Sequence, residues 1–398
     1  MLSAEEAADY LGVTKRTLYA YVSRGLLVSE PAVGRERRYP LWSLDELKAR
    51  RAERREPAAA ALRWGTPVLE SALTLIDRGR LFYRGRDAAD ISRRASFEAV
   101  ASLLWSGETE GAADLFPTTS RGRTGGDAAG RLFVRLLDER TRHPLALAEP
   151  TRATLRAAGA IVARLFEAAG ASGRGTLPER LARGWRRAGA ADDLRAALIL
   201  CADHELNASA FAARVVAAAD APLPNALLAA LCALEGRRHG GASREVADFL
   251  DDIERVGARR ACERVLAHRG RAPGFWGGHH LYPDGDPRAV ELLRRLDLPA
   301  RDPAAKAVAF MDELDAMPTI ELALAAFARR ERLPRDGAFA VFAVGRSVGW
   351  VAHAFEAAAA GTLIRPRARY VGPPPKQGRA GAPTRRDLLG KGRSDHET

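Results

Sequence analysis

Residues 199–217 read ILCADHELNASAFAARVVA, in which Asp203, His204 and Glu205 stand together between two runs rich in Ala, Leu and Val. Apolar residues at helical spacing recur on both sides of this polar triplet and through most of residues 71–372, interrupted by Gly and Pro. No sustained run of strand-like alternation occurs there. The sequence therefore predicts an all-α body.

Length and composition indicate a globular chain of two or three domains. The chain has 398 residues, of which 47% are hydrophobic. It contains no uncharged apolar run of about 18 residues, and its N-terminus is acidic, so neither a membrane span nor a signal peptide is expected. Cys201, Cys232 and Cys262 are odd in number and widely spaced, which favours buried, reduced thiols in a cytoplasmic protein.

The net charge of +12 favours polyanionic partners, but its distribution limits that argument. Residues 1–56 hold eleven Lys/Arg and nine Asp/Glu, a net of +2. Residues 365–398 hold nine Lys/Arg and three Asp/Glu, a net of +6 and half of the total. Residues 373–398 are also rich in Pro and Gly and are expected to be a disordered basic tail.

The first 56 residues predict a small helical domain. Ser3 and Glu6 have capping-box spacing, a Gly-Val turn follows the first short helix, and Thr14 can cap a second helix. Leu18 and Val22 would face inward on that second helix. A basic turn, a short strand and another amphipathic helix come next. Two short helices around a tight turn form the helix-turn-helix pattern.

The order EEAADYLGVTKRTLYAYVSRGLL (5–27) followed by GRERRY (34–39) resembles the MerR-like or excisionase-like winged helix-turn-helix family. That resemblance implies that the second helix enters the major groove while the basic wing contacts phosphates. The implied DNA-binding residues are Lys15, Arg16, Thr17, Tyr19, Arg35, Arg37 and Arg38. A small helical domain that no longer binds DNA is the alternative. Residues 57–70 would form a linker to the body.

Histidine, arginine and glycine gather in four clusters of the body: ADHELNAS (202–209), RHGGAS (238–243), GFWGGHHLYPDGDPR (274–288), and GRSVGWVAH (345–353) followed by RPRARY (365–370). Their histidines lack metal-ligand spacing, and no Gly-x-Ser-x-Gly elbow is present, so neither metal binding nor nucleophilic catalysis is expected. Proton transfer and anion binding are the roles that remain for the residues of these four clusters. Several His and Arg together suit a small polycarboxylate with a reactive carbonyl.

These clusters, with TLIDRGRLFYRGRDAADISRRASFEAVASLLWSGE (74–108), resemble the citrate synthase family in order and spacing. The resemblance implies an all-α, two-lobed helical domain over residues 71–372, with a small lobe at about 242–326. Residues 110–190 match the family poorly. The implied reaction condenses acetyl-CoA, or a related acyl-CoA, with oxaloacetate and then hydrolyses the thioester. Neither metal nor redox cofactor is implied.

The resemblance also assigns roles to individual residues. His239 would donate to the thioester carbonyl, and His279, nine residues before Arg288, would polarise the oxaloacetate ketone. His204 would bind oxaloacetate or product. The remaining assignments are carboxylate binding by Arg288, Arg346 and Arg365, and CoA binding by Pro273, Gly274 and Phe275. Because the family supplies the last arginine from the partner subunit, a homodimer with shared sites is implied. The alternatives are a core histidine for His204 and solvated surface charges for the arginines.

Two departures from the family pattern bear on activity. The family's catalytic base is an aspartate in PN(I/V)D, whereas residues 317–321 read MPTIE, so Glu321 is the implied base. Residues 273–279 read PGFWGGH where the family has PGFGH, which adds two residues beside CoA. These departures keep a second interpretation open, a transcriptional regulator that uses the body as a metabolite sensor. A third interpretation leaves both domains structural.

Overall fold

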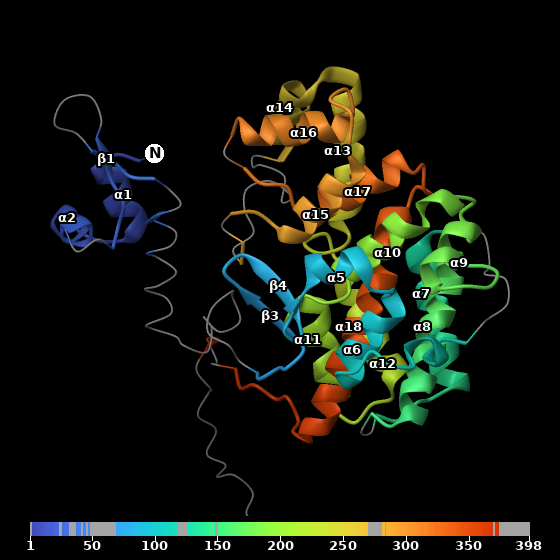
Figure 1. Ribbon diagram of the computed structural model, residues 1–398. Coiled ribbons are helices and arrows are strands. Elements are labelled where there is room, and N and C mark those ends of the chain that lie inside the picture. Colours follow the sequence, from blue (N-terminus) through green and yellow to red (C-terminus); the bar gives the residue numbers. More distant parts are fainter. Residues whose placement is uncertain are drawn as a thin grey trace, which may run out of the picture. The chain divides into compact units, whose positions relative to one another are not determined.

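The computed structural model describes residues 2–23, 26–31, 37–40, 43–44, 47, 69–117, 126–147, 150–269, 281–282, 284–314, 316–368 and 371–373 (Figure 1). Helices dominate the described residues, which confirms the all-α prediction. The few strands are short and pair only with strands nearby in the chain.

The N-terminal part contains helices α1 (Ala4–Leu11) and α2 (Lys15–Ser23) and the antiparallel strands β1 (Glu30–Pro31) and β2 (Arg37–Arg38). The capping box of Ser3 and Glu6 forms at α1, and the Thr14 hydroxyl accepts the backbone N–H of Thr17 at 3.3 Å. Gly12 ends α1 in the left-handed region at φ 61°, which suits glycine. A separate core holds this part together, made of Ala7, Ala8, Leu11, Leu18, Leu27, Tyr39, Leu44 and Leu47.

The body begins with a three-stranded antiparallel sheet, in the order β3 (Thr74–Asp77), β4 (Arg80–Tyr83) and β5 (Arg86–Asp87). The helices that follow are α5 (Ala88–Arg94), α6 (Phe97–Ser106), η1 (Ala112–Leu115), α7 (Ala128–Arg142), α8 (Arg152–Ala169), α9 (Leu177–Gly184), η2 (Ala188–Ala190), α10 (Ala191–Leu200), α11 (Ala208–Ala217), α12 (Leu223–Leu234), α13 (Ala242–Val256), α14 (Ala258–Arg269), α15 (Pro287–Leu296), α16 (Pro303–Asp312), α17 (Ile320–Arg330) and α18 (Gly337–Ala360).

Helix α18 is the centre of the body, and helices α6, α8, α10, α11 and α12 pack around it (Figure 1). All its residues from Gly337 to Phe355 are buried, so it is apolar on every side. It is the one helix among the described residues long and apolar enough to span a membrane, but that apolar window is wholly buried within the protein. The apolar composition of α18 is therefore that of a helix buried in the core of the protein.

Helices α13, α14 and α16 pack against one another, and α13 and α16 also contact α17. Helices α13, α14 and α16 fall within the range predicted for the small lobe, and α17 runs beyond its end at about residue 326; the boundaries of the lobe stay a prediction. Two cysteines are buried as expected, but Cys232 is exposed on α12, and the expectation of burial was wrong for it. The helical period places position 232 on the outer side of α12, which composition alone does not reveal.

Candidate active site

The ADHELNAS segment forms the turn between α10 and α11. Asn207 caps α11, because its Oδ1 accepts the backbone N–H groups of Ser209 and Ala210 at 3.1 and 3.2 Å. The Asn207 amide also donates to the His204 carbonyl at 3.1 Å. Glu205 takes a left-handed conformation with φ 48°. The turn is therefore closed by its own polar side chains.

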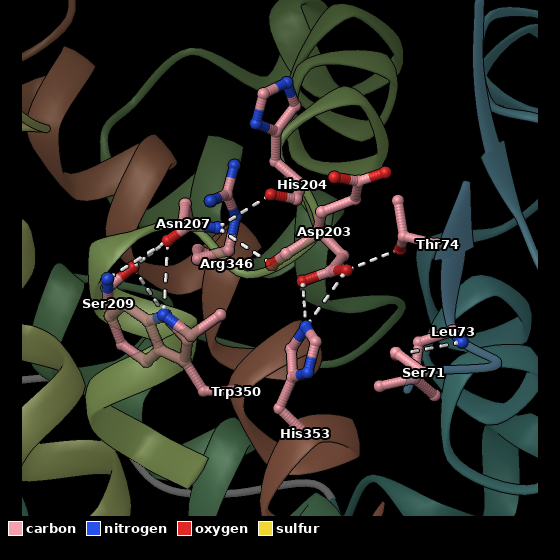
Figure 2. A network of polar contacts seen from close by, with 12 residues as sticks. Ser71, Leu73, Thr74, Asp203, His204, Asn207, Ser209, Arg346, Trp350 and His353 are labelled. Atoms are coloured by element: carbon pink, nitrogen blue, oxygen red, sulfur yellow. Dashed lines mark hydrogen bonds and ion pairs between the residues drawn. The ribbon is translucent and has the colours of Figure 1, made fainter. Parts of the chain in front are cut away.

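Asp203 is the fully buried centre of a polar network (Figure 2). Its carboxylate accepts the Thr74 hydroxyl at 2.5 Å and lies 3.2 Å from Nε2 of His353 on α18. Burial by itself raises the pKa of Asp203, but His353, Arg346 and Thr74 together lower it below its ordinary value. Gly349 makes this approach feasible, since a Cβ there would overlap the Ala202 carbonyl oxygen. The network fixes the turn against the core helix.

His204 is buried and faces Tyr282, which lies just before α15. Its Nε2 lies 2.9 Å from the Tyr282 hydroxyl, and the ring centroids are 5.5 Å apart. Burial raises the pKa of Tyr282, so the phenol stays protonated. In Figure 2, His204 points away from the Asp203 network, although the two residues are adjacent in sequence.

His239 lies in the turn between α12 and α13, where Gly240 and Gly241 follow it. Its Nε2 is 2.9 Å from the Ser209 hydroxyl, and its ring meets the Phe342 ring edge-on at 5.8 Å. Burial, then the charges of Arg346 and Arg288, lowers the pKa of His239 from 6.5 to about 3. The imidazole is therefore neutral at physiological pH.

The tautomer of His239 depends on Ser209. The Ser209 hydroxyl has one proton and two acceptors in reach, Asn207 Oδ1 at 2.7 Å and His239 Nε2 at 2.9 Å. Trp350 Nε1 donates to the same hydroxyl oxygen at 3.1 Å. When the hydroxyl proton goes to Asn207 Oδ1, Ser209 accepts the Nε2–H of His239. When Ser209 instead donates to Nε2, the hydrogen of the neutral imidazole lies on Nδ1, which can then donate to a ligand.

Two buried arginines bring positive charge to the same region. Arg346 on α18 is 1% exposed, and its Nε donates to the Cys201 carbonyl at 2.6 Å. Its Nη2 is buried and has no hydrogen-bond partner within the described part of the chain. Arg288 is 3% exposed and forms a two-pronged ion pair with Asp286 at 2.9 and 2.7 Å. Neither arginine is the solvated surface charge of the alternative interpretation.

Glu321 lies half-buried in the first turn of α17. Asp286 connects this helix to α15, since its Oδ2 accepts the backbone N–H of Ile320 at 3.3 Å while the same carboxylate holds Arg288. The charge of Glu321 acts on Arg288 and on the Cys201 thiol.

The structure thus brings His204, His239, Arg346 and Arg288 into one buried region, with Glu321 beside it. Their predicted roles stay predictions. Arg365 is exposed, in a separate C-terminal unit that begins at Ile364. His279, Pro273, Gly274 and Phe275 lie outside the described residues. No group of three or more His, Cys, Asp or Glu suitable for a metal ion occurs among the residues that the structure describes.

The predicted DNA-binding residues have mixed surroundings. Arg16, Arg37 and Tyr19 are exposed, and Thr17 and Arg38 are half-buried. Lys15 is exposed but pairs with Glu5 at 3.0 Å. Arg35 lies outside the described residues.

Sequence reasoning missed the residues that support the site, namely Thr74, Tyr83, Ser209, Tyr282, Phe342, Trp350 and His353. One signal was present, because His353 follows Arg346 by seven residues and two helical turns place both on one face of α18. All of these residues except Phe342 lie within the sequence motifs, but those other than His353 carry no spacing signal of their own.

Comparison with known proteins identifies the family of this chain. Residues 61–164 and 176–367 match the family model described as citrate synthase, C-terminal domain. This chain belongs to the citrate synthase family. Residues 1–52 separately match a helix-turn-helix domain model.

The curated relatives include citrate synthases and a 2-methylcitrate synthase. A putative citrate synthase 2 of Mycobacterium tuberculosis is 38% identical over 190 residues, which cover 45% of this chain and 50% of the relative. The chain therefore spans about half the length of the curated relatives it matches at that level. A Haloferax volcanii citrate synthase is 28% identical over 369 residues, covering 77% of this chain and 94% of the relative. A 2-methylcitrate synthase of Mycobacterium tuberculosis is 28% identical over 344 residues, covering 73% and 84%.

Solved citrate synthase structures share the fold. The Thermotoga maritima enzyme superposes with a TM-score of 0.60 at 25% identity, covering 79% of this chain and 96% of that one. The Thermoplasma acidophilum enzyme, in a ternary complex with carboxymethyl coenzyme A and oxaloacetate, gives a TM-score of 0.64 at 22% identity, with 79% and 96% covered.

Proposed function

We propose that this protein is a citrate synthase-type acyltransferase that joins an acyl-CoA to oxaloacetate. The observation that carries the proposal is the buried Arg346 guanidinium, whose Nη2 has no hydrogen-bond partner among the described residues. A buried guanidinium nitrogen without a hydrogen-bond partner is costly unless a ligand anion completes its hydrogen bonding. A substrate carboxylate would do so through a two-pronged hydrogen bond.

The proposed reaction distributes proton transfers among three residues. Glu321 would remove a proton from the α-carbon of the acyl-CoA while the Nδ1–H of neutral His239 donates to the thioester oxygen as charge develops there. The resulting enol carbon would attack the oxaloacetate ketone, which His279 would protonate. Water would then cleave the thioester and release CoA and the tricarboxylate. The proposed reaction needs no metal or redox cofactor.

A thiol-release assay with oxaloacetate and several acyl-CoAs tests the proposal. The wild type should release CoA with at least one donor, and His239→Ala should lower kcat by about 100-fold or more. Absence of release with every donor would refute the function. Glu321→Asp separates two cases, because a gain in kcat would show that the native base is misplaced, whereas a loss would show that the site is built around glutamate.

We also propose a homodimer with shared sites, supported by the family's use of an arginine at the Arg365 position. Co-expression of Arg365→Ala with His239→Ala chains tests it. Mixed dimers would contain one site with both lesions and one intact site, so about a quarter of wild-type activity should return with random mixing. Unshared sites would give no recovery.

A second candidate function is DNA-binding regulation by an oxaloacetate-sensing body. The match over residues 1–52, the separate core, and the exposed Arg16 and Arg37 favour it. Duplex affinity should fall with salt, and Arg16→Ala and Arg37→Ala should each weaken binding and reduce the salt slope by about one. Unchanged affinity and slope in both variants would remove this candidate. A change in duplex affinity on adding oxaloacetate would identify the body as the sensor.

A further inference from the structure

Strand β3 holds the residues on both sides of His204. The Thr74 hydroxyl donates to Asp203 Oδ2 at 2.5 Å, and the backbone N–H of Ile76 donates to Glu205 Oε1 at 3.1 Å. Figure 2 shows Thr74 directed at the Asp203 carboxylate from the sheet, with His353 on the other side. Asp203 is therefore held between β3 and α18.

Strand β4 supports the same turn. Tyr83 lies opposite Thr74 in the antiparallel register and is fully buried. Its hydroxyl lies 3.0 Å from the Ile199 carbonyl and 3.2 Å from the Asp203 carbonyl. The hairpin thus contacts both the end of α10 and the turn that follows.

The Thr74 hydroxyl is the one contact that β3 makes with the Asp203 carboxylate among the described residues. Without it, Oδ2 loses its hydroxyl donor, and the remaining attraction comes from His353 and Arg346 on α18. A fully buried carboxylate needs each of its donors, so it would move toward His353 and Arg346. Because His204 is the next residue, movement of Asp203 would change the direction of the His204 imidazole.

We propose that Thr74 is a positioning residue, whose hydrogen bond to Asp203 holds the His204 turn in the orientation that binds oxaloacetate. This inference rests on the proposed function, because it assigns Thr74 to the oxaloacetate half of the site. It does not involve the acyl-CoA half.

Thr74→Val, which keeps the shape and removes the hydroxyl, is the direct test. The KM for oxaloacetate should rise roughly tenfold, while the KM for acyl-CoA stays unchanged and kcat changes by less than about threefold. Thr74→Ser should restore the KM because it keeps the hydroxyl. Leu75→Ser is the matched control, since Leu75 is the next residue of β3 and is 55% exposed. An oxaloacetate KM in Thr74→Val equal to that of the wild type would overturn the proposal.

A mutant cycle distinguishes positioning from general destabilisation. If Thr74 acts through Asp203, adding Thr74→Val to Asp203→Asn should raise the oxaloacetate KM no further. Additive effects would overturn the proposal, and thermal midpoints measured alongside show whether a variant has failed to fold.

One readout does not need turnover. In wild-type protein labelled with 15N-histidine, the His204 signal can be assigned by its loss in His204→Ala, and its titration midpoint should shift in Thr74→Val but not in Leu75→Ser. If the wild type releases no CoA but the His204 midpoint still shifts in Thr74→Val, the proposed function alone is refuted. An unchanged His204 midpoint in Thr74→Val would refute the positioning role alone.

Discussion

Replacing Arg346 by methionine should separate stability from ligand binding. The side chain is 1% exposed, so the substitution removes a charge while filling nearly the same volume. It deletes the Nε hydrogen bond to the Cys201 carbonyl, a loss of about 1.5–3 kcal/mol for a charged donor. It also removes the buried, unpartnered Nη2, whose desolvation costs about 1–3 kcal/mol or more. The two contributions nearly cancel, and the lost attraction between Arg346 and the buried Asp203 carboxylate leaves a net fall of a few degrees in the unfolding midpoint.

Binding should change far more than stability. A carboxylate held by two charge-assisted hydrogen bonds contributes about 3–4 kcal/mol, which corresponds to roughly 100- to 1,000-fold in kcat/KM. In a thermal unfolding assay, oxaloacetate at about 100 times Kd should stabilise the wild type by about 2.7 kcal/mol and the variant hardly at all. Thiol release then measures the loss of activity directly.

Arg84→Met is the matched control. Arg84 also donates to a carbonyl, that of Leu104, at 2.9 and 3.1 Å, but it has no assigned role in the site. This variant should lose stability and keep its response to oxaloacetate. If Arg346→Met kept the oxaloacetate response, or lost stability as Arg84→Met does, the argument from the unpartnered guanidinium would be wrong.

Three further predictions follow from the same contacts. Since the pKa of His239 is depressed to about 3, its contribution to the free energy of unfolding is complete above pH 6.5 and is lost as the pH falls from 6.5 toward 3. In denaturant titrations from pH 7 to 4, the free energy of unfolding of His239→Gln should therefore fall less steeply with pH than that of the wild type, by up to about 1.4 kcal/mol per pH unit. An unchanged dependence on pH would contradict the depressed pKa. Ser209→Ala should lower kcat by roughly 10- to 100-fold with little change in KM, because His239 loses the hydroxyl group that fixes its tautomer. A rise in KM with kcat unchanged would argue against that role. Gly349→Ala should destabilise the protein by about 1–3 kcal/mol in denaturant unfolding, because its Cβ would lie 2.6 Å from Asp203 Oδ1. Gly189→Ala is the control, because its Cβ would meet nothing within 4 Å.

The sequence by itself determined the local features of this protein. The Ser3 capping box, the Thr14 cap and the inward Leu18 depend on residues within about one helical turn, and all three form as expected. The ordered motifs carried the family resemblance because each motif is a contiguous stretch. Contiguous residues keep their spacing whatever the surrounding packing does.

Only the tertiary structure decided which side chains support the site. Thr74 and Asp203 are 129 residues apart, Asp203 and His353 are 150 apart, and His204 and Tyr282 are 78 apart. No period or spacing rule relates such positions, because their contacts depend on how α18, the β3–β4 hairpin and the segment before α15 meet around one turn. The same packing buries Arg346 and Arg288 and keeps His239 neutral. Burial and the sum of nearby charges are properties of the assembled core, so a histidine read from the sequence has no definite pKa until the core surrounds it.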